Sequence, residues 1–285
     1  MAAHPYRIVN VFTQNQGALT GNPLCVFENG ADFSTELMQG LARQFNLSET
    51  TFILPSTRGA ARVRIFTPNY EMPFAGHPTL GTAHVCRDLG LGGDTLELEM
   101  QAGMIPVRAA GDRWTLTALP PTSRELDIPR AELAAALGLA AGDIGERPLW
   151  IKAGKEQLVV PLTSTAAVKR AKPDSPALNR LKSEDGQSQA YVFAFDGTGR
   201  ALARFFFPQG GNFLEDPATG SATANFGGWC IATKQKLPLA LQISQGEMVG
   251  RPSHLYLNVG AGPKIEVGGD VIEIGRGSIQ LNWRH

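Results

Sequence analysis

A nine-residue phrase occurs twice in this chain, and its two copies lie about half a chain apart. Residues Glu71–Thr79 align without a gap on Glu215–Thr223, an offset of 144 (215 − 71) in a chain of 285 residues. An Arg-x-Phe-x-Pro motif precedes each copy, beginning at Arg64 and at Arg204, where the offset is 140. About four residues are therefore inserted ahead of the second copy. Solenoid repeats have periods of roughly 20–50 residues, so a repeat of this length predicts two copies of one domain.

Each copy of the phrase contains a glycine turn that is predicted to open a helix, at Gly76 and at Gly220. The first N–H groups of a helix lack partners within the helix, and the helix dipole adds positive charge at the same end. Helix N-termini therefore bind anions. Two such helix starts that face each other across a domain cleft would form one anion-binding site.

Composition limits the partners of the protein. Lys plus Arg and Asp plus Glu number 26 each, and 43% of the residues are hydrophobic. A chain with no net charge and no basic segment is not expected to bind nucleic acid or an anionic membrane. No apolar run is long enough to span a bilayer, and the N-terminus lacks a signal-peptide pattern. The three scattered cysteines, Cys25, Cys86 and Cys230, indicate reduced thiols, and we expect a cytoplasmic protein.

The repeat divides the chain into an N-terminal domain, 1–120, and a C-terminal duplicate, 121–270. A polar stretch that begins at Pro120-Pro121 is interpreted as the linker. Two C-terminal strands within 271–285 have no counterpart in the first half, and we expect them to complete the sheet of the N-terminal domain. Hydrophobic periodicity and capping residues predict the remaining elements. The predicted helices are 34–45, 77–89, 131–137 and 221–233, and the predicted strands are 8–12, 24–27, 49–54, 61–66, 95–100, 114–119, 157–160, 190–195, 201–207, 239–244 and 254–259.

The helix after each turn has almost no polar face. Residues such as Ala222, Phe226, Trp229 and Ile231 point in all directions around the second helix. A helix that is apolar all round must be buried all round. Either a sheet curls around it, or it packs between a sheet and the other domain, and periodicity leaves both arrangements open.

The two copies differ in their ionisable residues. His77 follows the first glycine where Ser221 follows the second, and Asp216 replaces Met72. Glu49, fifteen residues before the repeated Arg, corresponds to Gln189. Each of these residues alone has a structural explanation, as a helix cap, a first-turn charge or the exposed side of an edge strand. Together, at equivalent positions of a duplicated turn, they predict general acid–base chemistry, in which one group removes a proton and another returns it. Glu71 and Glu215 occur in both copies and are assigned to the architecture of the turn.

Motifs for other chemistries do not occur. The chain has no Gly-x-Gly-x-x-Gly dinucleotide fingerprint, no P-loop and no Gly-x-Ser-x-Gly elbow. Its histidines lack the spacing of a metal site. These chemistries therefore have no support in the sequence.

Several motifs, in order along nearly the whole chain, resemble the PhzF-like isomerase family of phenazine biosynthesis. They are Gly21-Asn22-Pro23, Leu47–Phe52, Ile65–Pro68, Pro73–Thr79 with Gly81-Thr82-Ala83, Glu215–Ala222, and Gln245-Gly246 with Gly250-Arg251-Pro252. The resemblance implies the diaminopimelate-epimerase-like α+β fold: two homologous domains, each a curved, mostly antiparallel sheet or barrel around a central helix. It also implies a cytoplasmic homodimer that needs neither metal nor cofactor.

The same resemblance assigns roles to six residues at the matching positions. Catalysis falls to Glu49 as the proton-transferring group, with His77 and Asp216. The carboxylate of the substrate is held by the residues of the two helix starts, Gly76, Gly220 and Ser221.

The predicted function is a cofactor-independent isomerase that moves a proton between carbons of a small carboxylic acid, by general acid–base catalysis in the interdomain cleft. One alternative is an amino-acid racemase or epimerase that works without thiols, since none of the three cysteines stands at either helix start. Another is a non-catalytic protein that binds small anions. Exchange of a carbon-bound proton with solvent would separate the catalytic functions from binding alone.

Overall fold

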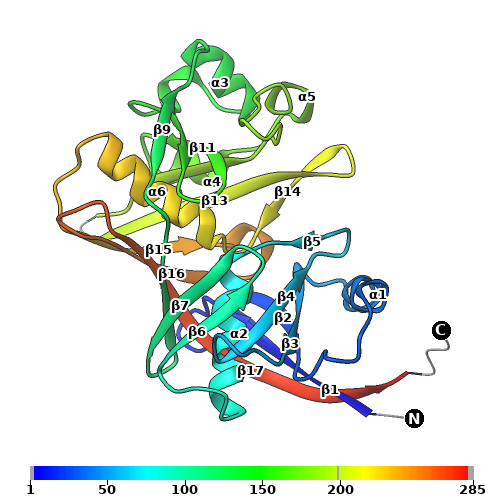
Figure 1. Cartoon of the computed structure of the whole chain (residues 1–285). Helices are drawn as coiled ribbons and strands as arrows, with labels where there is room; N and C mark the ends of the chain where they lie inside the picture. The colour runs from blue at the N-terminus through cyan, green and yellow to red at the C-terminus, as the bar shows by residue number, and fades with distance from the viewer. Residues whose placement is uncertain (1–2, 198, 282–285) are drawn as a thin grey trace. The chain divides into compact units, whose positions relative to one another are not determined.

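The computed structural model of the chain describes residues 3–197 and 199–281. The chain divides into two compact units, one of Met1–Leu116 with Gly268–His285 and one of Thr117–Val267. In each unit, strands curve around one helix, α2 (Gly76–Asp88) in unit 1 and α6 (Gly220–Ala232) in unit 2 (Figure 1). This agrees with the predicted α+β fold.

Unit 1 is built mainly from antiparallel strand pairs, with parallel pairs at β2–β3 and β4–β6. Its strands are β1 (Ala3–Val11), β2 (Asn22–Phe27), β3 (Glu49–Leu54), β4 (Ala61–Phe66), β5 (Glu71–Met72), β6 (Thr95–Met100), β7 (Gly103–Ala110) and β8 (Arg113–Thr117). The long β17 (Ile265–Gln280) pairs antiparallel with β1, from Ala3↔Gln280 to Val11↔Val271. The C-terminal segment thus contributes a strand to the sheet of unit 1.

The first helix, α1 (Thr35–Phe45), begins where its capping residue predicts. The Ser34 side chain accepts a hydrogen bond from the backbone N–H of Leu37 at 3.2 Å, which satisfies one of the unpaired donors of the first turn. Its apolar face packs on an aromatic cluster in which Phe27 and Phe52 stack with ring centroids 5.0 Å apart. This cluster fixes the strand that carries Glu49.

Helix α2 is buried on every side. Every residue from His77 to Cys86 is buried, and the helix packs against β1, β2, β3, β4 and β6 of its own unit. The arrangement is therefore a sheet curled around a central helix, one of the two that the sequence allows. Gly81 allows a close approach between the helix and the sheet, since an added Cβ there would lie 2.7 Å from Leu24 Cδ2.

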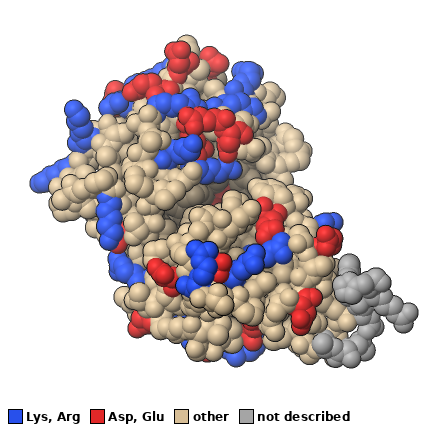
Figure 2. Space-filling model, in the orientation of Figure 1, with Lys and Arg blue, Asp and Glu red and all other residues tan. Residues whose placement is uncertain are grey.

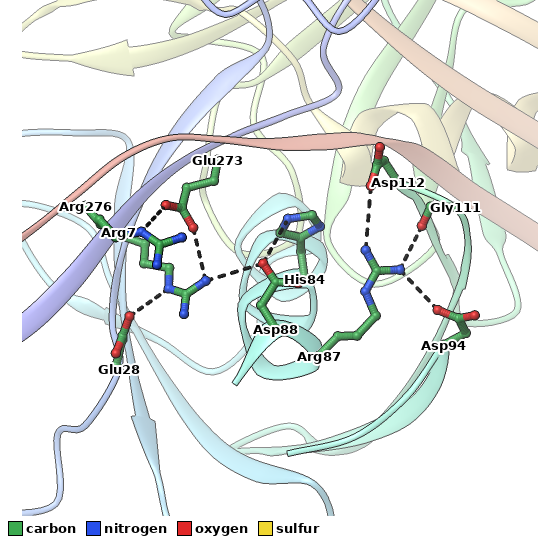
Figure 3. A network of polar contacts seen from close by, with 10 residues as sticks. All are labelled: Arg7, Glu28, His84, Arg87, Asp88, Asp94, Gly111, Asp112, Glu273 and Arg276. Atoms are coloured by element: carbon green, nitrogen blue, oxygen red, sulfur yellow. Dashed lines mark hydrogen bonds and ion pairs between the residues drawn. The ribbon is translucent and has the colours of Figure 1, made fainter. Parts of the chain in front are cut away.

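A network of ion pairs anchors the C-terminal end of α2 (Figure 3). The Arg7 side chain, 6% exposed, lies 2.7 Å from Glu28, 3.0 Å from Glu273 and 3.3 Å from Asp88 of the helix. Burial opposes the charge of the Arg7 guanidinium, but the adjacent carboxylates outweigh this effect and raise its pKa. Arg7 thereby joins β1, β17 and α2, and His84 Nε2 lies 3.8 Å from the same Asp88 carboxylate.

Unit 2 follows a similar plan, with parallel pairs at β11–β12 and β13–β15. Its strands are β9 (Thr122–Glu125), β10 (Leu149–Lys152), β11 (Glu156–Pro161), β12 (Ala190–Phe195), β13 (Arg200–Gln209), β14 (Asn212–Asp216), β15 (Leu239–Gln245) and β16 (Ser253–Val259). Its helices are α3 (Arg130–Ala136), α4 (Thr165–Arg170), α5 (Ser175–Leu178) and α6, with short 3₁₀ turns at Ala141–Asp143 and Glu247–Val249. Helix α6 packs against β9, β10, β11 and β16.

Several details differ from the sequence-based expectation. The stretch after Pro121 is not a free linker, because β9 pairs antiparallel with β10 from Thr122↔Lys152 onward. Strands β5, β7, β9, β10 and β14 and helices α4 and α5 were not predicted. The two predicted C-terminal strands form the single strand β17. Part of that predicted segment, 282–285, lies outside the described residues. The division into duplicated domains 1–120 and 121–270 stays a prediction.

The visible surface carries both signs of charge. On the face shown in Figure 2, Lys and Arg side chains alternate with Asp and Glu over both units. Among the described residues, no helix has the length and apolar character needed to cross a membrane.

Candidate active site

The repeated Arg and Glu form the same ion pair in both units. Arg64 Nε and Nη2 donate to Glu71 at 2.7 and 2.6 Å. Arg204 donates from the same two nitrogens to Glu215 at 3.0 and 2.6 Å. Each guanidinium also lies over the phenylalanine ring two residues further on, at 5.0 and 4.8 Å. These contacts hold each turn on its strand, which agrees with the structural role assigned to both glutamates.

The four inserted residues lengthen one hairpin of unit 2. Strands β13 and β14 pair as far as Gln209↔Asn212. The two residues between them, Gly210 and Gly211, both have positive φ, at 59° and 83°, a conformation that glycine adopts without steric cost. In unit 1 the corresponding strand β5 has two residues. The insertion therefore changes the hairpin and leaves the repeated turn unchanged.

Both repeated turns open a helix of thirteen residues at the glycine. The residues at the two N-caps, Ala75 and Thr219, make no side-chain capping hydrogen bond, and neither first turn contains an acidic residue. The initial N–H groups at Gly76 and Gly220–Ser221 therefore have the electrostatics of an anion-binding helix start.

Unit 1 brings Glu49 and His77 together at the start of α2. Glu49 is the first residue of β3, and His77 Nδ1 lies 3.3 Å from Glu49 Oε2. The two side chains are 15% and 7% exposed. Burial lowers the pKa of His77 to about 3, and a hydrogen bond with the backbone of Pro23 raises it by less. The imidazole is therefore neutral at physiological pH, so the contact with Glu49 is not an ion pair.

Unit 2 places Asp216 at the end of β14, just ahead of its helix. Thr219 Oγ1 donates to Asp216 Oδ2 at 2.5 Å. Gln245, which is fully buried, donates from Nε2 to the Asp216 carbonyl at 2.8 Å and to Thr219 Oγ1 at 3.0 Å. The carboxylate is thus held by the turn that also opens α6.

Ser221 occupies the first turn of α6, and its hydroxyl accepts a hydrogen bond from Gln157 Nε2 at 3.2 Å. The same nitrogen lies 3.4 Å from Gln189 Oε1. The strand register supports the equivalence of Gln189 with Glu49, because in both units the residue three places further on pairs with the Arg of the repeat. Unit 1 thus gathers Gly76, Glu49 and His77, and unit 2 gathers Gly220, Ser221 and Asp216.

Two buried amide residues next to these groups, Gln157 and Asn225, were missed from the sequence, and Gln245 was named there only as part of a motif. Asn225 lies in the middle of the buried helix α6, and Gln157 directly precedes the apolar run of strand β11. Both are at most 1% exposed. A buried amide requires hydrogen-bond partners, so these exceptions to the pattern were the available signal.

The cysteines lie away from the two helix starts. Cys86 and Cys230 occupy equivalent positions near the far ends of α2 and α6, and burial raises the pKa of both thiols to about 12. Within 3–197 and 199–281, no group of three or more His, Cys, Asp or Glu residues is arranged to hold a metal ion.

Comparison with known proteins identifies the family. Residues 9–274 match the model of the PhzC-PhzF family, described as phenazine biosynthesis-like protein. The chain is 36% identical over 282 residues to an uncharacterized isomerase of Pasteurella multocida, covering 98% of this chain and 95% of that protein. It is also 36% identical over 295 residues to the trans-2,3-dihydro-3-hydroxyanthranilate isomerase of Pseudomonas aeruginosa, covering 98% and 100%.

Structural comparison gives the same family fold. The crystal structure of the Bacillus anthracis phenazine biosynthesis protein of the PhzF family superimposes with a TM-score of 0.88 at 22% identity, covering 99% of this chain and 100% of that one. The two-unit architecture and the match over nearly the whole chain define an isomerase. The chain belongs to the PhzF family.

Proposed function

We propose that this isomerase moves a proton between carbons of a small carboxylic acid by general acid–base catalysis, without a cofactor. The observation that carries the proposal is the buried pair Glu49 and His77 at the uncapped start of α2, with 3.3 Å between Oε2 and Nδ1. Once Glu49 has taken a proton from the substrate, the resulting carboxylic acid lies within reach of the neutral imidazole, which can form a hydrogen bond with it and orient it.

Each unit would supply a different part of the reaction. The N–H groups at Gly76, Gly220 and Ser221 bind the carboxylate of the substrate, because they are hydrogen-bond donors at the positive ends of helix dipoles. Glu49 removes a proton from a carbon made acidic by conjugation and returns it elsewhere on the same π system. His77 and Asp216 orient or share that proton. The proposal requires both turns to act on the same bound molecule.

The test follows carbon-bound hydrogen in D₂O. The probe is trans-2,3-dihydro-3-hydroxyanthranilate, the acid in the name of the Pseudomonas aeruginosa relative. We expect NMR to show deuterium entering at carbon together with a shift of the double bonds. An epimerase would introduce deuterium with loss of optical rotation and no double-bond shift. A binding protein would cause line broadening of the acid without deuterium, and either of these results would overturn the proposal.

A further inference from the structure

A chain of buried amides lies behind the Ser221 hydroxyl, within unit 2. It begins at the backbone of Ala153 and continues through the side chains of Asn225 and Gln157 to Ser221. Asn225 is fully buried and Gln157 is 1% exposed. Each link is a hydrogen bond between 2.7 and 3.2 Å long.

Backbone groups fix the orientation of the first amide. The Ala153 N–H can only donate, and it donates to Asn225 Oδ1 at 2.7 Å. The Lys155 carbonyl can only accept, and it accepts from Asn225 Nδ2 at 2.9 Å. The oxygen and nitrogen of Asn225 therefore cannot be exchanged without two donors or two acceptors facing each other.

The orientation of Asn225 fixes that of Gln157. Asn225 Nδ2 is a donor, so the Gln157 atom 2.8 Å away must be the acceptor Oε1. The other end of that amide is then Nε2, a donor, and it faces Ser221 Oγ at 3.2 Å. The serine oxygen accepts this bond, which leaves the hydroxyl hydrogen to point elsewhere.

The corresponding pair in unit 1 is apolar. The residue 144 positions before Asn225 is Gly81. Leu24 pairs with Glu49 in the register between β2 and β3. In unit 2, Gln157 and Gln189 directly precede the first pair of the β11–β12 register, Leu158↔Ala190, and their side chains are in contact. Gly81 packs directly on Leu24. The duplicated fold therefore does not need polar residues at these two positions, and the amides occur only behind the helix start that carries serine.

We propose that Asn225 and Gln157 are positioning residues that hold the Ser221 hydroxyl as a hydrogen-bond donor toward the carboxylate of the substrate. A carboxylate can only accept hydrogen bonds, so a hydroxyl that already accepts one from Gln157 is matched to it. This inference rests on the proposed function and extends it, because it explains how unit 2 selects an anion.

The kinetic test reverses the order of donors and acceptors along the hydrogen-bonded amides. In Gln157→Glu, one carboxylate oxygen still accepts from Asn225, but the other faces Ser221, whose hydroxyl must then donate inward. Hydrogen bonds to charged groups contribute about 1.5–3 kcal/mol, or roughly 10- to 100-fold in affinity. We expect KM for the acid to rise by roughly that factor while kcat changes much less. Gln39→Glu, a matched exchange of an amide that donates to the Thr67 carbonyl in unit 1, should leave KM unchanged.

Two further variants separate positioning from general damage. In Asn225→Asp, the second carboxylate oxygen would face Gln157 as an acceptor, so that amide would turn over and present its oxygen to Ser221. KM should rise here as well, although Gln157 and Ser221 are untouched. In a Ser221→Ala background, neither exchange should raise KM further. A KM that rises equally with and without the Ser221 hydroxyl would overturn the proposal.

A neutron diffraction structure of the whole chain, with crystals exchanged into D₂O, gives a readout that needs no substrate. We expect deuterium on Gln157 Nε2 directed at Ser221 Oγ, and the deuterium of the Ser221 hydroxyl directed away from Gln157. A hydroxyl deuterium directed at Gln157 would overturn the inference and leave the proposed function intact. Turnover of the acid with an unchanged KM in Gln157→Glu would also overturn the inference and leave the proposed function intact. A wild-type protein that exchanges no deuterium would instead overturn the proposed function.

Discussion

The helices α2 and α6 have the same length and the same glycine turn, but their polar contacts with the sheet are placed differently. Behind the start of α6, Asn225 bonds to Gln157, where α2 has Gly81 packed on Leu24. One position further along each helix, the hydrogen-bonded pair lies in unit 1 instead of unit 2. Thr82 and Thr51 share a buried hydrogen bond of 2.8 Å in unit 1, and the equivalent positions in unit 2 hold two aromatic rings with centroids 6.2 Å apart.

This difference shows how one backbone can serve two chemical purposes. Both helix starts keep N–H groups that have no partner within the helix, because those groups belong to the backbone. Unit 1 places apolar contacts behind His77, and its imidazole is buried and neutral. Unit 2 places amides behind Ser221, whose hydroxyl oxygen accepts a hydrogen bond from Gln157. We infer that the two units diverged after duplication, with the proposed base Glu49 in the first unit and the proposed hydroxyl donor Ser221 in the second.

The largest expected effect comes from changing Glu49, whose equivalent position in unit 2 is occupied by Gln189. Glu49→Gln should lower kcat by about 10²–10⁴-fold, the usual contribution of a positioned acid–base group. Gln189→Met, the matched change in unit 2, should lower kcat by less than about tenfold, because an amide does not exchange the proton in the reaction. Rates of deuterium incorporation measure both, and thermal unfolding checks that each variant folds. A Glu49→Gln enzyme with wild-type turnover would show that Glu49 is not the base.

The second comparison concerns the repeated ion pairs. Arg204 also donates from Nη1 to three carbonyls at the end of α4, those of Val168, Lys169 and Ala171, and its partner Glu215 is 7% exposed. Removing one partner of a buried pair costs about 3–5 kcal/mol, so Arg204→Met should lower the free energy of unfolding by about that amount.

Arg64→Met is the matched variant in unit 1. Its partner Glu71 is 29% exposed, so solvent compensates in part and we expect a cost of about 1–2 kcal/mol. Urea denaturation measures both values. Equal costs in the two units would contradict the stronger role inferred for Arg204.

The third comparison uses pH, since only the first helix start contains a buried titratable imidazole. His77 has a pKa of about 3 in the folded chain and about 6.5 when unfolded. Between these values the unfolded chain binds a proton that the folded chain does not, so stability falls as pH falls. Between pH 7.5 and pH 5 this residue should remove about 2 kcal/mol of stability.

Chemical denaturation at a series of pH values measures this effect as the difference between wild type and His77→Gln. The variant should lose less stability on acidification, and Ser221→Ala should follow the wild-type curve. Parallel curves for wild type and His77→Gln would show that His77 is not kept neutral by burial.

The smallest expected effect concerns the pair of threonines. Thr51→Val removes the hydrogen bond to Thr82, whose hydroxyl still donates to the Pro78 carbonyl at 2.7 Å. A buried hydrogen bond contributes about 1 kcal/mol, and we expect that loss in the free energy of unfolding. A matched exposed change, Thr122→Val, should alter it by less than about 0.5 kcal/mol. If both changes had the same effect, the buried bond would not contribute to stability.

The sequence was sufficient to predict the elements that depend on local pattern. The Ser34 cap, the strands of Glu49–Leu54 and Ala190–Phe195, and the two helix starts at the repeated glycines all follow from periodicity or from residue type at short range. Strand β7 was missed because Pro106 interrupts it and Val107 is its only buried residue.

The amide chain could not be predicted because it depends on the fold. Asn225 and Gln157 are 68 residues apart, and no spacing rule connects a helix residue with a strand residue at that distance. The orientation of each amide depends on backbone groups that only the folded unit brings close. By contrast, the candidate groups Glu49 and His77 were found because the duplication supplied an internal comparison.

The pairing of β17 with β1 has a consequence for synthesis on the ribosome. Unit 2 is contiguous, from Thr117 to Val267, whereas unit 1 needs the strand that follows it. About 150 residues separate the two parts of unit 1, and at about 5–20 residues per second their translation takes roughly 8–30 s. During that interval the nascent first unit has an open edge at β1, where chaperones could bind.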